Sequence, residues 1–78
     1  MENLEKYNNV FVETFGVPEE KLPSLHYNTN IEWDSVAHMQ LIASIENVFD
    51  IMFDMEDIVD FSSYEKGKEI LLKYNIKI

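Results

Sequence analysis

The amino-acid sequence predicts an all-α fold of four helices, the third of them short, with a long loop between the first and the second. Apolar residues recur at intervals of three or four in several segments, which is the period of a helix that packs one face against a core. Residues that cap, stop or break helices separate these segments. Apolar residues make up 46% of the 78 residues, enough for one compact core but, at this length, not for two. We therefore expect a single domain over residues 1–78.

The first helix is predicted over residues 3–15, where apolar residues repeat at helical spacing. Its apolar face is formed by Leu4, Tyr7, Val10, Phe11 and Phe15. Gly16 favours the left-handed conformation that ends a helix, and Pro18 prevents the helix from continuing.

A long loop follows the first helix. Residues 16–33 contain both prolines of the chain and no sustained period, so they predict a loop of about 18 residues. Loops of this length are uncommon in compact domains and are often functional. We expect Leu22, Leu25 and Ile31 to hold the loop against the core. Trp33 is expected to be buried as a lid over the loop and core, and direct contact with a bound group or a partner is the alternative.

The second helix is predicted over residues 35–50, with Asp34 as its N-cap. Its apolar stripe is formed by Val36, Met39, Leu41, Ile42, Ile45, Val48 and Phe49. A short third helix is predicted over residues 55–61, with Asp54 as its cap. This helix is expected to bury Met55, Ile58, Val59 and Phe61.

The last helix is predicted over residues 64–74, because Ser62 and Glu65 have the spacing of a capping box. It is expected to bury Ile70, Leu71 and Tyr74. Gly67 lies inside this helix, where glycine lowers helix propensity, and therefore predicts a close contact with a neighbouring helix.

Charge is distributed unevenly along the chain. Fifteen acidic residues stand against six lysines and give a net charge of −9. No lysine or arginine lies between Lys21 and Lys66, whereas nine acids do: Glu32, Asp34, Glu46, Asp50, Asp54, Glu56, Asp57, Asp60 and Glu65. Such a surface disfavours nucleic acids and anionic membranes and favours basic protein partners. Taken alone, it indicates solubility, and partner steering is favoured only if other features identify a docking protein.

Several classes of function are disfavoured by the sequence. The chain has no cysteine, so neither a disulfide framework nor a thiolate metal site is expected. The acids of residues 50–60 lack the spacing and the glycine of a calcium-binding loop, so we expect a solvated acidic face and no metal site. The chain has no apolar run long enough to span a bilayer and no basic head of a signal peptide, which predicts the cytoplasm and no membrane insertion.

The histidines do not complete a hydrolytic site. His26 and His38 are expected to be surface residues, and neither is accompanied by the orienting acid and oxyanion hole that a serine nucleophile at Ser35 would need. The sequence therefore predicts no catalytic residue.

The Asp34-Ser35 pair is the feature that carries a functional hypothesis. A serine at the first position of a helix has its hydroxyl beside free backbone N–H groups and the positive end of the helix dipole. A phosphate group attached there would be stabilised as phosphates are at helix N-termini. The dipeptide alone most often marks a simple helix cap, so its context decides.

The context resembles the acyl carrier protein family. The residues that carry the resemblance are the triplet Asp34-Ser35-Val36, the aliphatic helix behind it, and the later Glu46, Phe49 and Asp50. Phe15-Gly16-Val17 is similar to the end of the family's first helix, and Ser62-Ser63-Tyr64 to the start of its last one. The resemblance covers nearly the whole chain, including its length and the long first loop.

This resemblance implies a four-helix bundle of the acyl-carrier-protein type and a carrier without enzymatic activity. A phosphopantetheinyl transferase would move 4'-phosphopantetheine from coenzyme A to the Ser35 hydroxyl, beside Asp34. The thiol of that arm would hold an acyl group as a thioester and present it to acyl-loading and acyl-transferring enzymes. The resemblance further implies a monomer that docks weakly through the residues Val36, Met39, Glu46, Asp50, Asp54, Glu56 and Asp57.

Three methionines are relevant to how an acyl group would be held. Met39, Met52 and Met55 have core spacing, and their adaptable side chains would suit a core that opens to shelter an acyl chain between the second and third helices.

Departures from the family pattern indicate a specialised pathway. Trp33 stands where carriers of fatty-acid synthesis usually have a small residue, and Ala37, Gln40 and Ala43 stand where those carriers often have acids and a methionine. These differences favour surface-polysaccharide or secondary-metabolite assembly. The alternative function is an unmodified acidic adaptor that keeps the fold for protein binding only. The presence of a serine at position 35 favours the carrier.

Overall fold

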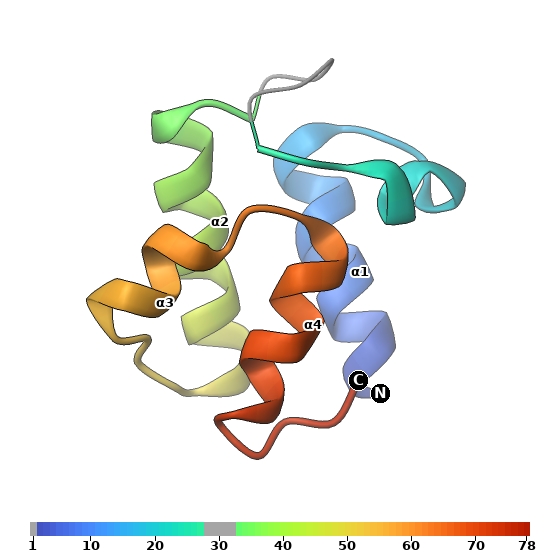
Figure 1. Ribbon diagram of the computed structural model, residues 1–78. Coiled ribbons are helices and arrows are strands. Elements are labelled where there is room, and N and C mark those ends of the chain that lie inside the picture. The colour runs from blue at the N-terminus through green and yellow to red at the C-terminus, as the bar shows by residue number, and fades with distance from the viewer. Residues whose placement is uncertain (1, 28–32) are drawn as a thin grey trace.

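The computed structural model describes residues 2–27 and 33–78 and is mostly helical (Figure 1). Its elements are α1 (Asn3–Phe15), the 3-10 helix η1 (Glu19–Ser24), α2 (Ser35–Phe49), α3 (Met55–Asp60) and α4 (Tyr64–Leu72). The described part of the chain contains no strand, only an isolated bridge between His26 and Ser63. The all-α prediction is therefore confirmed. The expectations for Ile31 and Glu32 lie outside the described residues.

The helices begin and end close to the predicted positions. Gly16 is left-handed, with φ 66°, and its N–H donates to the Val12 carbonyl at 2.8 Å, which ends α1 as expected. Asp34 caps α2, because its Oδ1 accepts from the Ala37 N–H at 2.9 Å. Asp50, with φ 55°, ends α2 at Phe49, one residue earlier than predicted.

The last two helices differ from the prediction in detail. The Asp54 side chain makes no capping hydrogen bond to α3, which ends at Asp60. The cap of α4 is Ser63, whose hydroxyl accepts from the Lys66 N–H at 2.9 Å, and not Ser62. The capping register was therefore wrong by one residue. Asn75 adopts φ 65° in the turn that follows α4, which ends at Leu72 and not at residue 74.

The described part of the long loop, up to Tyr27, contains a helix that its sequence did not predict. Residues 19–24 form η1, with Pro23 inside it. A short 3-10 helix tolerates a proline, because few of its N–H groups need an internal acceptor. Leu22 and Leu25 are buried, as expected. The loop is tied to the α3–α4 connection by two backbone hydrogen bonds, from Tyr27 N–H to Ser62 O at 2.7 Å and from Tyr64 N–H to Leu25 O at 3.1 Å.

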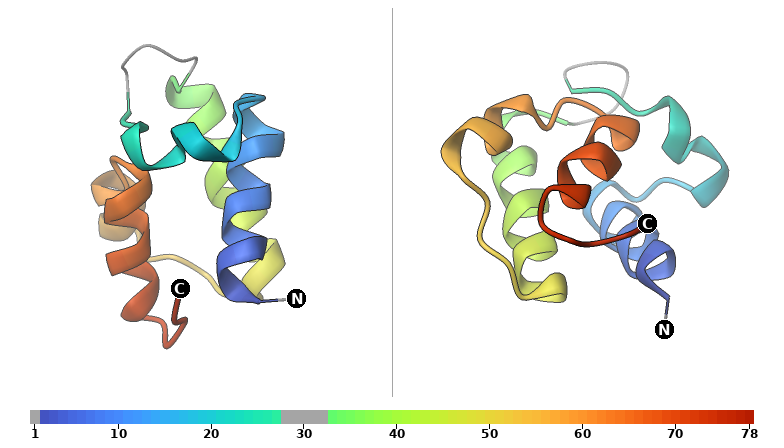
Figure 2. Two further views of the ribbon diagram at one scale, coloured as in Figure 1. Left: turned by 90° about the vertical axis from the view of Figure 1, so that its right-hand side faces the viewer. Right: turned by 60° about the horizontal axis from the view of Figure 1, so that its bottom comes forward.

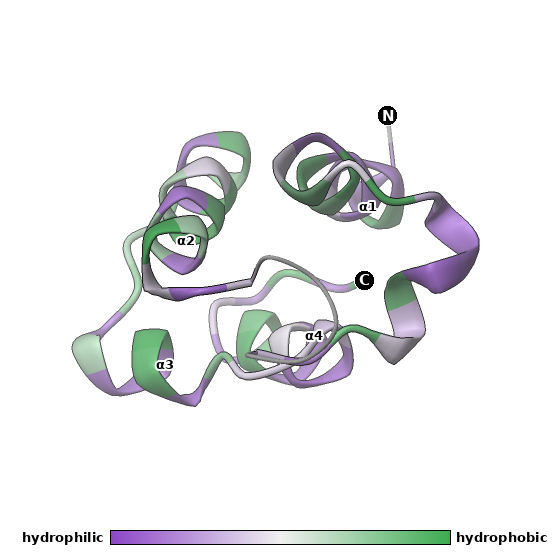
Figure 3. Cartoon of the chain, turned by 90° about the horizontal axis from the view of Figure 1, so that it is seen from above, coloured by the Kyte–Doolittle hydropathy of each residue, from purple (hydrophilic) through white to green (hydrophobic). Residues whose placement is uncertain are grey.

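The helices form two layers. Seen from above, α1 and α2 lie on one side and α3 and α4 on the other, with apolar residues between them (Figure 3). η1 crosses the top between the layers (Figure 2). The side-chain amide of Asn3 donates to the Lys77 carbonyl at 3.1 Å, so the two ends of the described chain meet at the bottom of the fold. The radius of gyration of 11.3 Å agrees with the roughly 11.5 Å expected for a folded domain of this length.

An aromatic cluster around Phe11 forms the centre of the core. Phe11 is fully buried, and five rings lie with centroids 4.9–6.3 Å from its own. These rings belong to Tyr7, Phe15, Trp33, Phe61 and Tyr64. Tyr7 and Phe15 belong to α1 and Tyr64 to α4, whereas Trp33 directly precedes α2 and Phe61 directly follows α3. All four α-helices are therefore connected to this one cluster.

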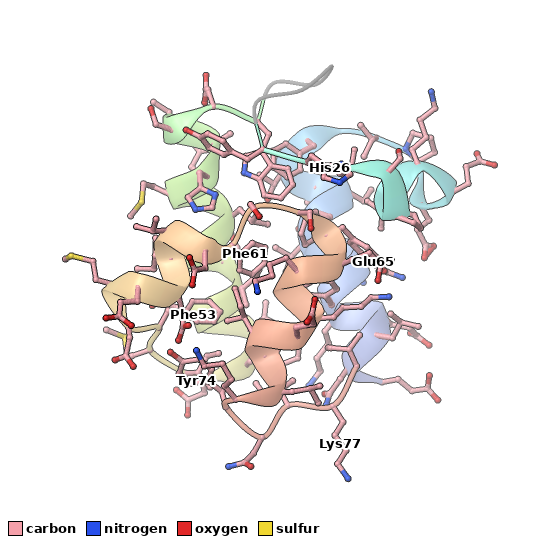
Figure 4. All side chains as sticks on the ribbon, in the orientation of Figure 1. His26, Phe53, Phe61, Glu65, Tyr74 and Lys77 are labelled. Carbon is pink, nitrogen blue, oxygen red and sulfur yellow. The ribbon has the colours of Figure 1, made fainter. Side chains whose placement is uncertain are left out.

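The expectation that the methionines pack in the core is wrong. Met39, Met52 and Met55 are 55%, 78% and 81% exposed, and Val59 is 75% exposed. α3 has only six residues and is apolar on two sides, so helical spacing does not indicate which side faces the core. The core is filled instead by Phe53 and Phe61 at the two ends of α3, which Figure 4 shows directed into the interior.

The close contact predicted at Gly67 is confirmed. A Cβ at this position would overlap the Tyr7 hydroxyl and the Phe61 ring. The Tyr7 hydroxyl is fixed, because it donates to the Tyr64 carbonyl at 2.6 Å. The close approach of α4 to α1 at this point therefore requires a residue without a side chain, which is Gly67.

Gly67→Ala is expected to destabilise the protein. The overlap costs roughly 1–3 kcal/mol and outweighs the gain in helix propensity, which is about 1 kcal/mol at most. Urea unfolding measures the difference, with the exposed Glu69→Ala as the control that changes the free energy of unfolding by less than about 0.5 kcal/mol. A Gly67→Ala variant as stable as the parent would contradict the packing described here.

Candidate functional site

Ser35 is the first residue of α2 and is exposed. The Asp34 side chain before it accepts from the Ala37 N–H and the Asp34 carbonyl accepts from the His38 N–H, which leaves the N–H groups of Ser35 and Val36 without an acceptor in the helix. The adjacent Asp34 carboxylate is engaged by the Ala37 N–H, and the first turn itself carries no further acidic residue. A phosphodiester on the Ser35 hydroxyl would therefore lie at the positive end of a 15-residue helix.

A groove of about 390 Å³ opens beside Ser35, between α2 and α3. Its lining is mainly apolar and consists of Tyr27, Ser35, His38, Met39, Ile58, Val59, Phe61 and Ser62. Three separate segments thus line the groove: Tyr27 from the loop, the first turns of α2, and α3 with the connection that follows it. The groove can receive an apolar group that is tethered to the Ser35 hydroxyl.

His38 is buried in the wall of this groove, and the expectation of a surface histidine is wrong. Its Nδ1 lies 3.0 Å from the Trp33 indole nitrogen, and its Nε2 lies 2.7 Å from the Ile58 carbonyl oxygen. The indole N–H can only donate and the carbonyl can only accept, so the neutral ring carries its proton on Nε2. His38 therefore links the segment before α2 to α3.

Trp33 is buried, as the lid interpretation expected. Its ring packs 5.8 Å from that of Phe11 and 5.1 Å from that of Phe15, which joins the start of α2 to the end of α1. Tyr27 stands edge-on to the His38 ring at 5.4 Å and forms one rim of the groove. Trp33 therefore holds the segment before Ser35 against α1 by packing and against His38 by a hydrogen bond.

The acidic residues predicted to dock partners differ in their exposure to solvent. Glu46 is half-buried, and its Oε2 accepts from the Phe53 N–H at 2.9 Å, so its carboxylate holds the α2–α3 connection. Asp50, Asp54 and Glu56 are exposed. Asp54 also donates its backbone N–H to the Tyr74 hydroxyl at 2.9 Å.

Asp57 is buried, and its assignment to the solvated acidic face is wrong. Its two carboxylate oxygens accept from Lys73 Nζ and from the Tyr74 hydroxyl, each at 2.6 Å. These hydrogen bonds lower the pKa of Asp57, and the one from Lys73 has the largest effect. Tyr74 also packs on Phe53 (Figure 4). Asp57 thus anchors α3 to the turn after α4, a contact between residues too distant in sequence to give a local pattern.

The stability of the protein is expected to depend on this anchor in a pH-dependent way. A carboxylate whose pKa is lowered by folding contributes stability above the ordinary aspartate value of about 3.9 and loses it as the pH falls through the lowered value. Asp57→Asn should cost about 1–2 kcal/mol at pH 7, and the cost should shrink below about pH 4. Urea unfolding of both proteins from pH 2 to pH 7 measures it, and a difference independent of pH would argue against the anchor.

The exposed side chains of α2 and α3 form a single apolar surface with an acidic border. We name it the α2–α3 face, and its residues are Met39, Met55, Glu56, Val59 and Asp60. Exposed apolar patches with polar borders mark interaction sites in many proteins. Of the predicted docking residues, Met39 and Glu56 therefore lie on this face, next to the groove beside Ser35. Val36 instead lines a hollow between α1 and α2, together with Phe15 and Gln40.

Within residues 2–27 and 33–78, no group of three or more histidine and acidic side chains is arranged to hold a metal ion. The helices described are also each too short or too polar to cross a membrane. Comparison of the chain with protein-family models, with curated proteins and with solved structures finds no match. The interpretation of the site therefore depends on its own residues and geometry.

Proposed function

We propose that this chain is an acyl carrier protein, which carries an acyl group as a thioester on a 4'-phosphopantetheine arm attached to Ser35. The observation that supports it most strongly is the position of Ser35, exposed at the N-terminus of α2 and at the rim of an apolar groove. Helix N-termini favour phosphate, and apolar grooves favour acyl chains. A carrier needs both next to one nucleophilic hydroxyl.

The roles of the individual groups follow from this arrangement. The transferase would supply coenzyme A, and the Ser35 oxygen would displace the adenosine 3',5'-bisphosphate part from the phosphopantetheine phosphorus. The free N–H groups of the first turn of α2 would stabilise the resulting phosphodiester. The arm's own thiol, and no protein side chain, would carry the acyl group. An acyl group placed beside Val59 and Phe61 would be shielded from water on one side.

The α2–α3 face would dock the partner enzymes: the phosphopantetheinyl transferase and the enzymes that load and receive the acyl group. Its methionines adapt to different surfaces, and its acids steer basic patches towards Ser35. Such contacts are fast and sensitive to salt. Compared with carriers of fatty-acid synthesis, this chain has a large residue at Trp33 and small or neutral residues at Ala37, Gln40 and Ala43. These differences favour a specialised biosynthetic pathway.

One alternative is supported by an observation of its own. The α2–α3 face is exposed whether or not Ser35 is modified, so an unmodified adaptor would use the same surface for protein binding. The two functions differ only in the covalent arm.

The carrier function predicts a defined gain in mass. Incubation with coenzyme A and a broad-specificity phosphopantetheinyl transferase should add one phosphopantetheine to the chain, because the Ser35 hydroxyl is exposed. Ser35→Ala should add none. Ser62→Ala is the matched control, because Ser62 lines the same groove, and it should be modified like the parent. Intact-protein mass spectrometry gives the result, and an unmodified parent chain would favour the adaptor.

The docking role predicts that charge matters on one face only. Glu56→Lys should slow the modification of Ser35 by about two- to tenfold, because it reverses a charge on the α2–α3 face. Glu20→Lys makes the same change on η1, on the other side of the fold, and should have little effect (Figure 1). Initial rates at low and high salt measure both. Equal rates for the two variants would indicate that the acidic residues of the α2–α3 face contribute to solubility and not to docking.

A further inference from the structure

The groove beside Ser35 has a closed floor. His38 and Phe61 line it with their ring centroids 6.2 Å apart, and both side chains are buried. The Trp33 ring, also buried, lies 6.1 Å from the ring of His38 and 6.5 Å from that of Phe61. Apolar atoms are in contact at about 4 Å, so a hydrocarbon chain between two ring faces needs roughly 8 Å. The groove therefore does not continue between these three rings into the core.

α3, which forms the other wall of the groove, is tied down at several points. Just before it, the Phe53 N–H donates to Glu46 Oε2 of α2 at 2.9 Å. Within it, the Ile58 carbonyl accepts from His38 Nε2 of α2 at 2.7 Å. On its other side, Asp57 accepts two hydrogen bonds from the turn after α4, each at 2.6 Å. A chain could pass between α2 and α3 only if such bonds were broken, and buried polar groups without partners are costly.

The groove offers no charge to a bound group. Its lining, as far as the structure describes it, includes no lysine, arginine, aspartate or glutamate. Both ring nitrogens of His38 are already engaged, one by Trp33 and the other by Ile58. A carboxylate or an ammonium group placed here would lose its hydration without gaining a partner of opposite charge. The groove therefore favours an uncharged, apolar group.

The size of the groove limits the length of that group. Its volume of about 390 Å³ is near the lower end of the range for small-molecule sites, which is roughly 300–1,000 Å³. Because the floor is closed, a longer group has no further buried space beyond it.

We propose that the group carried on Ser35 is a short, uncharged acyl group, a few carbons or one small ring in size, which lies in the groove and does not enter the core. The proposal rests on the proposed function and adds the chemical class of its cargo. Two classes of acyl group are not sheltered by such a groove. A long fatty chain is covered only over its first carbons, and a group with a free carboxylate or ammonium stays in solvent.

Four acyl groups test the proposal: butanoyl, hexanoyl, tetradecanoyl and succinyl, each transferred with its arm from the acyl-coenzyme A to Ser35. Methyl resonances of Ile58 and Val59 report on the groove, and those of the fully buried Ile45 and Leu71 report on the core. Relative to the unacylated arm, butanoyl and hexanoyl should move the groove resonances, and tetradecanoyl should move them no further than hexanoyl. Succinyl, with the same four carbons as butanoyl, should leave them in place. The core resonances should not move with any of the four.

Core resonances that move with tetradecanoyl, or groove resonances that succinyl moves as far as butanoyl does, would overturn the proposal. Groove resonances that no acyl group moves would also overturn it. Val59→Trp fills the groove and should abolish the effect of hexanoyl on Ile58, and a persistent effect would count against the groove as the binding place. Val48→Trp is the matched control, because Val48 is also exposed and lines the opposite groove, between α1 and α2, and it should leave the effect intact.

A second attachment separates this proposal from the proposed function. The chain has no cysteine, so Ser35→Cys provides a single thiol, which alkyl methanethiosulfonates convert to a butyl, hexyl or tetradecyl disulfide without a transferase. The same pattern of groove and core resonances is expected, and core resonances that move with the tetradecyl group would overturn the closed floor. A failure of the proposed function would appear separately, as a parent chain that gains no phosphopantetheine while the tethered chains still show the pattern.

Discussion

The packing of aromatic rings around Phe11 is the constraint on which the rest of the structure depends. The chain has no cysteine, so it has no disulfide, and its 78 residues provide only one core. Phe11 touches rings from α1, from the start of α2, from the α3–α4 connection and from α4. Gly67 lets α4 come close enough for these contacts. One shared cluster therefore connects α1, the segment before α2, the α3–α4 connection and α4, whereas α3 is held in addition by the hydrogen bonds of Asp57 and Ile58.

The same cluster determines the geometry of the candidate site. Trp33 packs on Phe11 with one part of its ring and donates to His38 with its N–H, so the core fixes the residue two positions before Ser35. Phe61 packs on Phe11 and also lines the groove. The carrier function that we propose thus requires no flexible scaffold. The serine projects from a rigid helix start, and only the tethered arm needs to move.

The sequence predicted local features well and orientations poorly. Gly16, Asp34 and Gly67 act through their own backbone or their nearest neighbours, so their roles could be inferred from position alone. The outward direction of Met55 and the burial of Asp57 depend on which side of the short α3 meets the core. The burial of His38, on α2, depends on where α3 packs against it. Partners such as Lys73 for Asp57 and Ile58 for His38 lie 16 and 20 residues away and leave no periodic pattern. The groove beside Ser35 has the same origin, because α3 forms half of it.

The most direct test of the carrier interpretation is an amide ¹H–¹⁵N spectrum of the chain before and after treatment with coenzyme A and a phosphopantetheinyl transferase. The account predicts large shifts at Ser35 and smaller ones at the groove residues Val59 and Phe61, with the α1 residue Glu5 unchanged. An unchanged spectrum, or shifts centred on the opposite groove between α1 and α2 that Val10 and Gln40 line, would contradict it.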